Sequence, residues 1–295
     1  MRTNTGYITT DDGVRLFYES VGTGQAMLLV PNGPPWIKDF TRFARNRTIV
    51  FYDARNRGQS DYLTGRTKLA RGVDNDVDDM EAVRRHFGVN RVDIFGHSYL
   101  GLAVILYAMK YGDHVNRVVQ VGTTPPDGAK QYPAELTGAD DILRDVLSKL
   151  EALRVNPPSG DPEQRCRAFW SVLRKIYIVD PTDVEKLDGW QRCHLRTEQT
   201  AATYFTEYLL PSIRPLTARD VSGVTMPVLV VHGTKDRSAP YGGGRDWAAM
   251  LPNARLVTVE NAGHIPWIEK PGDVFDTLQT FLDGAWPSTA VRLKY

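Results

Sequence analysis

The first third of the sequence leads to the segment Val92-Asp93-Ile94-Phe95-Gly96-His97-Ser98-Tyr99-Leu100-Gly101-Leu102-Ala103, which is its most informative part. A short β-rich run is followed by a turn of small residues that carries Ser98, and then by a helix-forming run. This order predicts an elbow that exposes the Ser98 hydroxyl at the carboxyl edge of a sheet. The start of the helix would direct unpaired N–H groups and a partial positive charge toward an oxyanion beside the serine. Ser98 is therefore a candidate nucleophile.

The elbow departs from the usual G-x-S-x-G pattern at one position. Leu100 stands where the second glycine is expected, and the glycine follows at Gly101. That position is normally small because the turn packs tightly, so Leu100 implies extra space or a relaxed elbow. Taken alone, the segment is equally compatible with an ordinary strand–turn–helix in which the serine caps the helix.

Two later strand ends carry the residues that would activate a serine. Pro227–Val231 is a buried strand pattern whose following loop carries Asp236, and Arg255–Val259 is a second one followed by Gly263 and His264. Strand ends at one edge of an open α/β sheet converge in space. The alternative interpretation is that Asp236 only helps to form a turn and that His264 is an ordinary loop histidine, with no catalytic role for either.

At these motifs the chain resembles the α/β-hydrolase family, most closely the branch that contains proline iminopeptidases and related esterases. The resemblance is carried by "GHSYLG", "HGTKD", "NAGHIPW" and "PNGPPW" and spans nearly the whole sequence. It implies that Ser98 is the nucleophile, that His264 acts as general base and then acid, and that Asp236 orients the imidazole.

Acyl transfer also needs N–H donors for the developing oxyanion. One is expected from the backbone of Tyr99, and the second from the loop Pro31-Asn32-Gly33-Pro34-Pro35, where the family branch has H-G-G-P-G. Prolines have no N–H, so elimination favours Gly33, with Asn32 as the other candidate. The alternative is a rigid turn with no catalytic role.

The alternation of strand and helix patterns predicts an α/β fold: a doubly wound, mostly parallel, eight-stranded sheet. The strand pattern stops over residues 124–221, where helical patterns predict an α-helical lid inserted between strands 6 and 7. Residues 1–123 and 222–295 then form the two parts of the hydrolase core. Trp36 and Trp267 are expected to face the cavity between sheet and lid and to contact the substrate. Aromatic lid residues are further pocket candidates, namely Trp170, Trp190, Tyr204, Phe205 and Tyr208.

Composition excludes several classes of partner. The 295 residues carry 36 basic and 35 acidic side chains, a formal net charge of +1, so neither nucleic acid nor an anionic membrane is indicated. No apolar run approaches the ~18 residues of a transmembrane helix, and the first residues lack a signal-peptide pattern, so a cytoplasmic location is expected. Cys166 and Cys193 are expected to be reduced thiols in such a location. No metal or other cofactor is predicted, and the oligomeric state is left open.

A charged loop, Asp53-Ala54-Arg55-Asn56-Arg57-Gly58-Gln59-Ser60, resembles the family's D-x-R-G-x-G-x-S segment, with Asn56 interpreted as an insertion. Arg55 and Arg57 could bind an anion, but an Asp–Arg pair that locks the loop is the simpler explanation. His97 and His232 are candidates for residues that contact the catalytic side chains and hold them in position without contacting the substrate.

The sequence favours hydrolysis of a small or medium apolar carboxylic ester, with a small-molecule substrate. The first alternative is proline iminopeptidase activity, which needs carboxylates such as Glu198 or Glu207 to hold a free amine. The alternative of another class is a ligand-binding protein without hydrolytic activity on the same fold.

Overall fold

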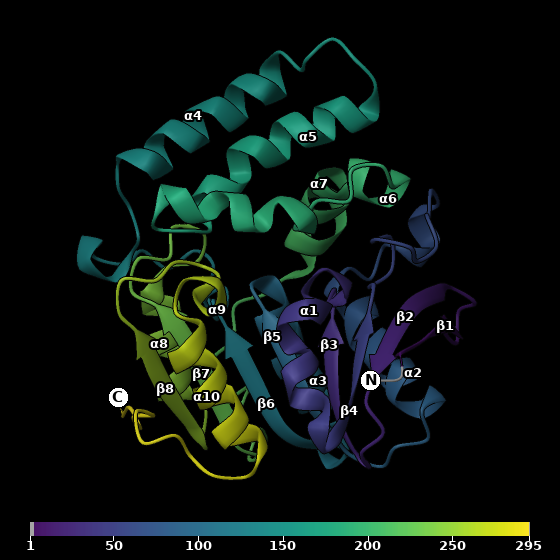
Figure 1. Ribbon diagram of the computed structural model, residues 1–295, viewed down its shortest axis with the longest axis vertical. Coiled ribbons are helices and arrows are strands. Elements are labelled where there is room, and N and C mark those ends of the chain that lie inside the picture. The colour runs from purple at the N-terminus through teal and green to yellow at the C-terminus, as the bar shows by residue number, and fades with distance from the viewer. Residues whose placement is uncertain (1–2, 295) are drawn as a thin grey trace.

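The computed structural model describes residues 3–294, without the side chains of Pro34 and Asp188. The outermost residues of the predicted core segments, Met1, Arg2 and Tyr295, lie outside this range. The strands form one eight-stranded sheet in the order β1-β2-β4-β3-β5-β6-β7-β8 (Figure 1). Their bounds are β1 Thr3–Thr9, β2 Arg15–Val21, β3 Ala26–Pro31, β4 Arg47–Tyr52, β5 Val92–His97, β6 Val115–Val121, β7 Val228–Gly233 and β8 Ala254–Val259.

The sheet is mostly parallel, as predicted. β2 pairs antiparallel with β1 and with β4, and the remaining neighbours run parallel. The strands are apolar along their length because both faces are covered. Met27 and Leu29 of β3 face one hydrophobic cluster, whereas Leu28 and Val30 face the other.

Helices cover each face of the sheet and complete the doubly wound arrangement. The first cluster includes residues of α2 (Val73–His86), α3 (Tyr99–Lys110) and α8 (Tyr241–Met250). The second includes residues of α1 (Ile37–Phe40) and α10 (Pro271–Leu282). The predicted fold class is confirmed.

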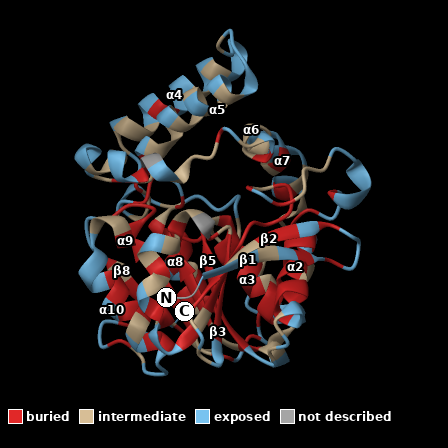
Figure 2. Cartoon of the chain, turned by 45° about the vertical axis from the view of Figure 1, so that its right-hand side comes forward, coloured by how far each residue is buried: buried red, intermediate tan, exposed pale blue. Residues whose placement is uncertain are grey.

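A helical insertion separates β6 from β7 and lies across one end of the sheet (Figure 1). Its main helices are α4 Asp141–Val155, α5 Pro162–Leu173, α6 Arg196–Gln199 and α7 Ala201–Tyr204; between and after them come the 3₁₀ segment η7 Pro181–Trp190 and the π-helical turn η8 Phe205–Leu209. Asp161 caps α5 by accepting the Gln164 N–H at 2.8 Å, with Pro162 at the first helical position. Figure 2 shows buried residues concentrated in the sheet and its flanking helices, while α4 and α5 are largely intermediate or exposed.

Polar contacts join the insertion to loops that follow the strands. Arg192 forms an ion pair with Asp53 at 2.8 Å, and Thr197 Oγ1 donates to the Gly58 carbonyl at 2.5 Å. Both core residues belong to the loop after β4. The insertion therefore lies over the carboxyl ends of the strands, where the sequence places the catalytic candidates.

The two cysteines form a disulfide, so the expectation of reduced thiols is wrong for this structure. Cys166 lies on α5 and Cys193 in the loop before α6, 27 residues apart in sequence, and their Cα atoms are 5.6 Å apart. Packing of α5 against α6 brings the two side chains together, which their sequence separation did not reveal. The bond ties the outer helices of the insertion to the segment that contacts the core.

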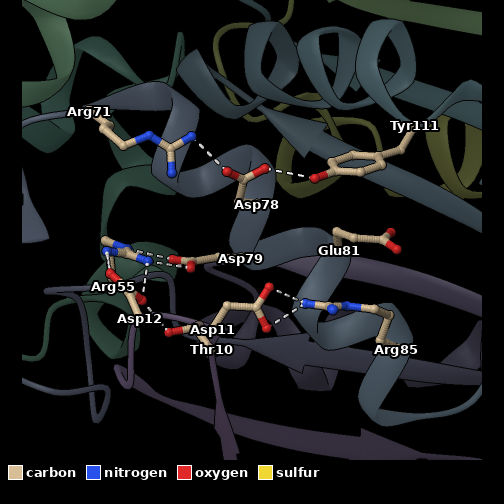
Figure 3. A pocket seen from close by; sticks show the side chains of 10 residues that line it. All are labelled: Thr10, Asp11, Asp12, Arg55, Arg71, Asp78, Asp79, Glu81, Arg85 and Tyr111. Atoms are coloured by element: carbon tan, nitrogen blue, oxygen red, sulfur yellow. Dashed lines mark hydrogen bonds and ion pairs between the residues drawn. The ribbon is translucent and has the colours of Figure 1, made fainter.

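A surface cleft of about 400 Å³ lies beside the β1–β2 turn and α2 (Figure 3). Its charged side chains neutralise one another: Arg55 pairs with Asp79 at 2.6 Å, and Arg85 pairs with Asp11 at 2.8 Å. None of the candidate catalytic residues lines it. The cleft is therefore separate from the site described below.

Two further features concern partners. Within residues 3–294, no helix is both long enough and apolar enough to cross a bilayer. The same residues contain no cluster of three or more His, Cys, Asp or Glu side chains arranged to hold a metal ion.

Candidate active site

Ser98 sits at a strained turn between β5 and α3. Its φ of +60° and ψ of −131° are unusual for a residue with a side chain, as expected for a nucleophile elbow. A Cβ on Gly96 would lie 2.3 Å from the Leu100 carbonyl oxygen, so the turn needs a glycine there. The same holds for Gly101, whose added Cβ would lie 2.4 Å from Thr123 Oγ1. Leu100 is 3 % exposed and packs in the core, so the close approach is made by Gly101.

Asp236 and His264 are hydrogen-bonded beneath the insertion. The Nδ1 of His264 donates to Asp236 Oδ2 at 2.9 Å, and both side chains are at most 1 % exposed. The other carboxylate oxygen accepts the N–H groups of Ser238 and Ala239, each at 2.8 Å. These bonds fix the carboxylate and present the far nitrogen of the imidazole, Nε2, which has no partner among residues 3–294.

His232 completes the environment of Asp236. Its Nε2 lies 3.2 Å from Asp236 Oδ2 and 3.0 Å from the Ala239 carbonyl oxygen. Burial by itself would raise the pKa of Asp236, but the charge of His264 and the hydrogen bonds from His232 and His264 outweigh it and hold the pKa well below its ordinary value. Asp236 is thus a permanent anion that can orient His264 and stabilise its protonated form.

His97 supports the main chain of His264. Its Nε2 donates to the His264 carbonyl oxygen at 2.9 Å, and the two rings are 4.5 Å apart. Burial, followed by the charge of His264, lowers the pKa of His97 well below its ordinary value, so it is a neutral donor. His97 and His232 both lie where a supporting role requires them.

The end of β6 brings the elbow and the Asp–His pair together. The Ser98 N–H donates to the Val121 carbonyl at 3.1 Å, and the next residue, Gly122, has a φ of +52°. A Cβ on Gly122 would lie 3.1 Å from His264 Nδ1 and 3.3 Å from Asp236 Oδ2. No hydrogen bond joins Ser98 to His264 within the described chain, which is common before a substrate tightens the site.

The predicted oxyanion loop follows β3, the neighbour of β5 in the sheet. Asn32 has a φ of +52°, and its Oδ1 accepts the Ala54 N–H at 3.0 Å, which fixes the loop against the end of β4. A Cβ on Gly33 would lie 2.7 Å from Val30 and Phe51. In the described part of the chain, the N–H groups of Gly33 and Tyr99 have no acceptor.

Trp36 and Trp267 lie between the sheet and the insertion but are buried in an aromatic cluster. They are 6 % and 1 % exposed, their rings are 5.7 Å apart, and Trp190 of η7 covers both. Both rings therefore lie at the expected place between the sheet and the insertion, where they pack among aromatic side chains of both layers. Substrate contact by these rings stays a prediction.

The loop after β4 is no longer than the family pattern. Asn56 has a φ of +58° and occupies the position of the first glycine in D-x-R-G-x-G-x-S, so it is a substitution and not an insertion. Arg55 pairs with Asp79 at 2.6 Å and locks the loop to α2, as the simpler explanation predicted.

Sequence reasoning missed two residues that hold the His264 loop. Glu269 accepts the N–H groups of Gly263 at 2.6 Å and Val179 at 2.8 Å, and thereby joins this loop to the insertion. The carbonyl of Tyr177 accepts the His264 N–H at 3.0 Å, and the Tyr177 ring lies 4.9 Å from the imidazole. Neither belongs to a motif, so only the folded arrangement of the insertion reveals them.

Comparisons with known proteins agree with this geometry. A family model described as alpha/beta hydrolase fold matches residues 32–271. The chain is 27 % identical to a proline iminopeptidase of Pestalotiopsis fici, covering 92 % of this chain and 97 % of that protein. It is 25 % identical to a bifunctional esterase/perhydrolase of Acinetobacter calcoaceticus, covering 88 % and 92 %. Among solved structures, an esterase from Exiguobacterium antarcticum superposes with a TM-score of 0.72 at 17 % identity, covering 95 % of this chain and all of that one. The chain belongs to the α/β-hydrolase fold family and is a hydrolase.

Proposed function

We propose that this hydrolase cleaves small or medium carboxylic esters through an acyl-enzyme intermediate on Ser98. The proposal is supported by the strained turn at Ser98, which lies beside the buried, hydrogen-bonded Asp236–His264 pair. The Nε2 of His264 has no hydrogen-bond partner among residues 3–294. A serine is a weak nucleophile until a base takes its proton. This arrangement supplies such a base at the end of the same sheet.

In the first half of the reaction, His264 Nε2 accepts the Ser98 proton as Oγ attacks the ester carbonyl carbon. The oxyanion is stabilised by the N–H groups of Gly33 and Tyr99, each worth roughly 10²–10³ in rate. The protonated imidazole then donates its proton to the leaving alkoxide. The carboxylate of Asp236 stabilises the imidazolium.

Water completes the cycle. His264 takes a proton from a water molecule that attacks the acyl carbonyl, and it returns the proton to Ser98 Oγ as the carboxylic acid leaves.

We propose that residues 124–221 act as a lid over the active site, with residues 1–123 and 222–295 forming the core. In this proposal Trp36 and Trp267 support the inner wall of the lid. A cytoplasmic location remains a prediction.

The proline iminopeptidase of Pestalotiopsis fici keeps aminopeptidase activity as the second candidate. That activity needs carboxylates to hold a free amine. Glu198 already accepts the Gly58 N–H at 2.8 Å and pairs with Arg192 at 3.2 Å, and Glu207 is exposed. The predicted amine-binding carboxylates are therefore engaged or turned to solvent, which favours the ester.

The test is turnover of p-nitrophenyl acetate and butyrate beside proline β-naphthylamide, with wild-type protein and S98A. We expect ester turnover that S98A abolishes. Turnover of the amide in preference to the esters would favour the iminopeptidase. Absence of Ser98-dependent turnover on every substrate would favour the non-hydrolytic binding protein.

A further inference from the structure

Arg57 is a charged side chain near the candidate site that has no role in the proposed mechanism. It lies beneath the insertion, with its Cζ 5.6 Å from the centre of the Tyr204 ring. Its Nε is buried and has no hydrogen-bond partner among residues 3–294. A guanidinium is permanently charged and has five N–H donors, and a buried donor without an acceptor is unfavourable. An acceptor is missing at this place.

The neighbouring arginines do not share this property. Arg55 pairs with Asp79 at 2.6 Å and with Asp12 at 2.9 Å, and Arg192 pairs with Asp53 at 2.8 Å. These pairs fasten the loop after β4 to α2 and to the insertion. Arg57 belongs to the same loop, but it has no carboxylate within ion-pair distance in the described chain, and its contact with the insertion is the Tyr204 ring.

Two tyrosines locate the Arg57 charge relative to the reacting groups. Tyr99 directly follows Ser98, and the Tyr177 ring lies 4.9 Å from the imidazole of His264. Burial and nearby carboxylates raise the pKa of both hydroxyls, that of Tyr177 to about 12, while the positive charge of Arg57 opposes the rise in each. The contacts agree on the nucleophile side: Arg57 lies against the Tyr204 ring, and the ring of the next residue, Phe205, lies 5.6 Å from the Tyr99 ring.

The buried carboxyl group of Asp76, on which the Arg57 charge acts, compensates this charge only in part. Asp76 accepts a hydrogen bond from the Tyr99 hydroxyl at 3.0 Å, and its other oxygen has no partner within residues 3–294. Burial and the charge of Asp79 raise the pKa of Asp76 to about 7, so a large share of it is uncharged near neutral pH. The surroundings of Arg57 keep a positive charge that an incoming anion can neutralise.

We propose that Arg57 binds a carboxylate carried by the substrate, near the ester that Ser98 attacks. The planar guanidinium matches a carboxylate with two parallel N–H···O bonds. The rings of Tyr204 and Phe205 would cover the apolar chain between the two groups. This inference rests on the proposed function and names its substrate class: esters of dicarboxylic acids, or of hydroxy acids, that keep one free carboxylate.

Paired esters test the proposal. On the acyl side, monomethyl succinate, glutarate and adipate are compared with methyl butyrate, pentanoate and hexanoate, in which a methyl group replaces the carboxylate. On the alcohol side, acetoxyacetate and 3-acetoxypropionate are compared with ethyl and propyl acetate. We expect wild type to prefer the charged ester at the best-fitting length, and R57Q to reduce that ratio of kcat/KM about 10- to 100-fold.

The matched control is R196Q, which removes an arginine charge from α6 of the insertion. Arg196 is exposed and stacks on Tyr62 at 4.1 Å, outside the Ser98 site. We expect R196Q to keep the wild-type ratio. Equal ratios in wild type and R57Q at every length and on both sides of the ester would overturn the proposal, as would an equal fall in R57Q and R196Q.

A binding measurement separates this inference from the proposed function. Calorimetry on S98A follows binding of monomethyl glutarate, with methyl pentanoate as the uncharged comparison. Binding of the charged ester that is lost in R57Q/S98A but kept in R196Q/S98A supports the anion site even if no ester is turned over. Ester turnover that depends on Ser98, with charged-ester binding indifferent to Arg57, would leave the hydrolase standing and remove the anion site.

Discussion

The sheet layer and the helical insertion differ sharply in burial. α3, which follows Ser98, buries most of its residues against the sheet, whereas α4 buries only Val146 and α5 has no buried residue. The sheet layer carries Ser98, Asp236 and His264, and the insertion touches them through Tyr177 and short polar contacts. A region with little buried apolar surface opens at a lower free-energy cost than the core.

This difference in burial suggests that the two layers have different roles in the proposed reaction. The proposed reaction depends on groups that the core fixes through buried hydrogen bonds, so their geometry does not depend on movement of the insertion. Substrate entry and selection fall to the surface between the layers, where Arg57, Tyr204 and Trp190 lie.

The largest expected effect is on catalysis in the sheet layer. S98A and H264A should each lower kcat/KM by roughly 10⁴- to 10⁶-fold, and the double variant should lose little more, because the residues act as a unit. D236N should cost about 10⁴-fold through a misoriented imidazole. The measurement is ester kinetics beside circular dichroism, to show that the variants fold. An H264A protein that retained a tenth of wild-type activity would identify a different base.

The next effect is on stability. Trp267 is 1 % exposed in the aromatic cluster, whereas Leu147 on α4 is 54 % exposed. W267A should lower the free energy of unfolding by about 3–5 kcal/mol, and L147A by no more than about 0.5 kcal/mol. Urea denaturation checks both. Equal losses in the two variants would contradict the contrast between the layers.

Asp76 gives the sheet layer a pH dependence whose sign is fixed. Burial and the charge of Asp79 raise its pKa to about 7, against about 3.9 in an unfolded chain. Between these values the folded protein binds more protons than the unfolded one. The stability that Asp76 contributes is therefore full below about pH 4 and is lost as the pH rises through 7.

The variant D76N isolates this contribution. The free energy of unfolding of wild type relative to D76N should fall by on the order of 1 kcal/mol per pH unit between pH 5 and 7. The control is D78N on the same helix: burial opposes it, but hydrogen bonds from Lys110 and Arg71 hold the pKa of Asp78 below its ordinary value. Its difference curve should be flat from pH 5 to 8. Parallel wild-type and D76N curves would refute the assignment.

Removal of the disulfide of the insertion is expected to act on the insertion more than on the core. A disulfide that closes a loop of this length stabilises a protein by about 2–4 kcal/mol, mainly because it restricts the unfolded chain. Here the bond lies in a segment that we expect to open locally, so most of its effect should stay within the insertion. The C166S/C193S variant should show faster hydrogen exchange and proteolysis within α4 and α5, with a smaller change in the core. A fall in core protection as large as that of the insertion would show that the two layers unfold together.

The sequence was most informative where one layer of the fold decides the structure. Apolar strand runs that end in Ser98, Asp236 and His264 predicted the sheet and the place of the candidate site, since parallel strand ends converge. The sharp turn at Ser98 was predicted from its small residues, and the structure gives Ser98 a φ of +60° there. These features depend on local pattern and on the topology of a single sheet.

Features that depend on contact between distant segments could not be predicted in the same way. The Cys166–Cys193 bond requires the packing of α5 on α6, and the burial of Trp36 requires Trp190 from the insertion. That Arg57 lacks an ion-pair partner in the described chain can be seen only once the partners of Arg55 and Arg192 are known. One of those pairs, Asp53 with Arg192, joins residues that are 139 positions apart in the sequence.

Covalent trapping shows whether Ser98 is the nucleophile that His264 activates. Wild type, S98A and H264A are treated with an alkyl fluorophosphonate, digested, and mapped by mass spectrometry. We expect one adduct, on the peptide that contains Ser98, absent in S98A and formed far more slowly in H264A. An adduct on another residue would show that Ser98 is not the nucleophile.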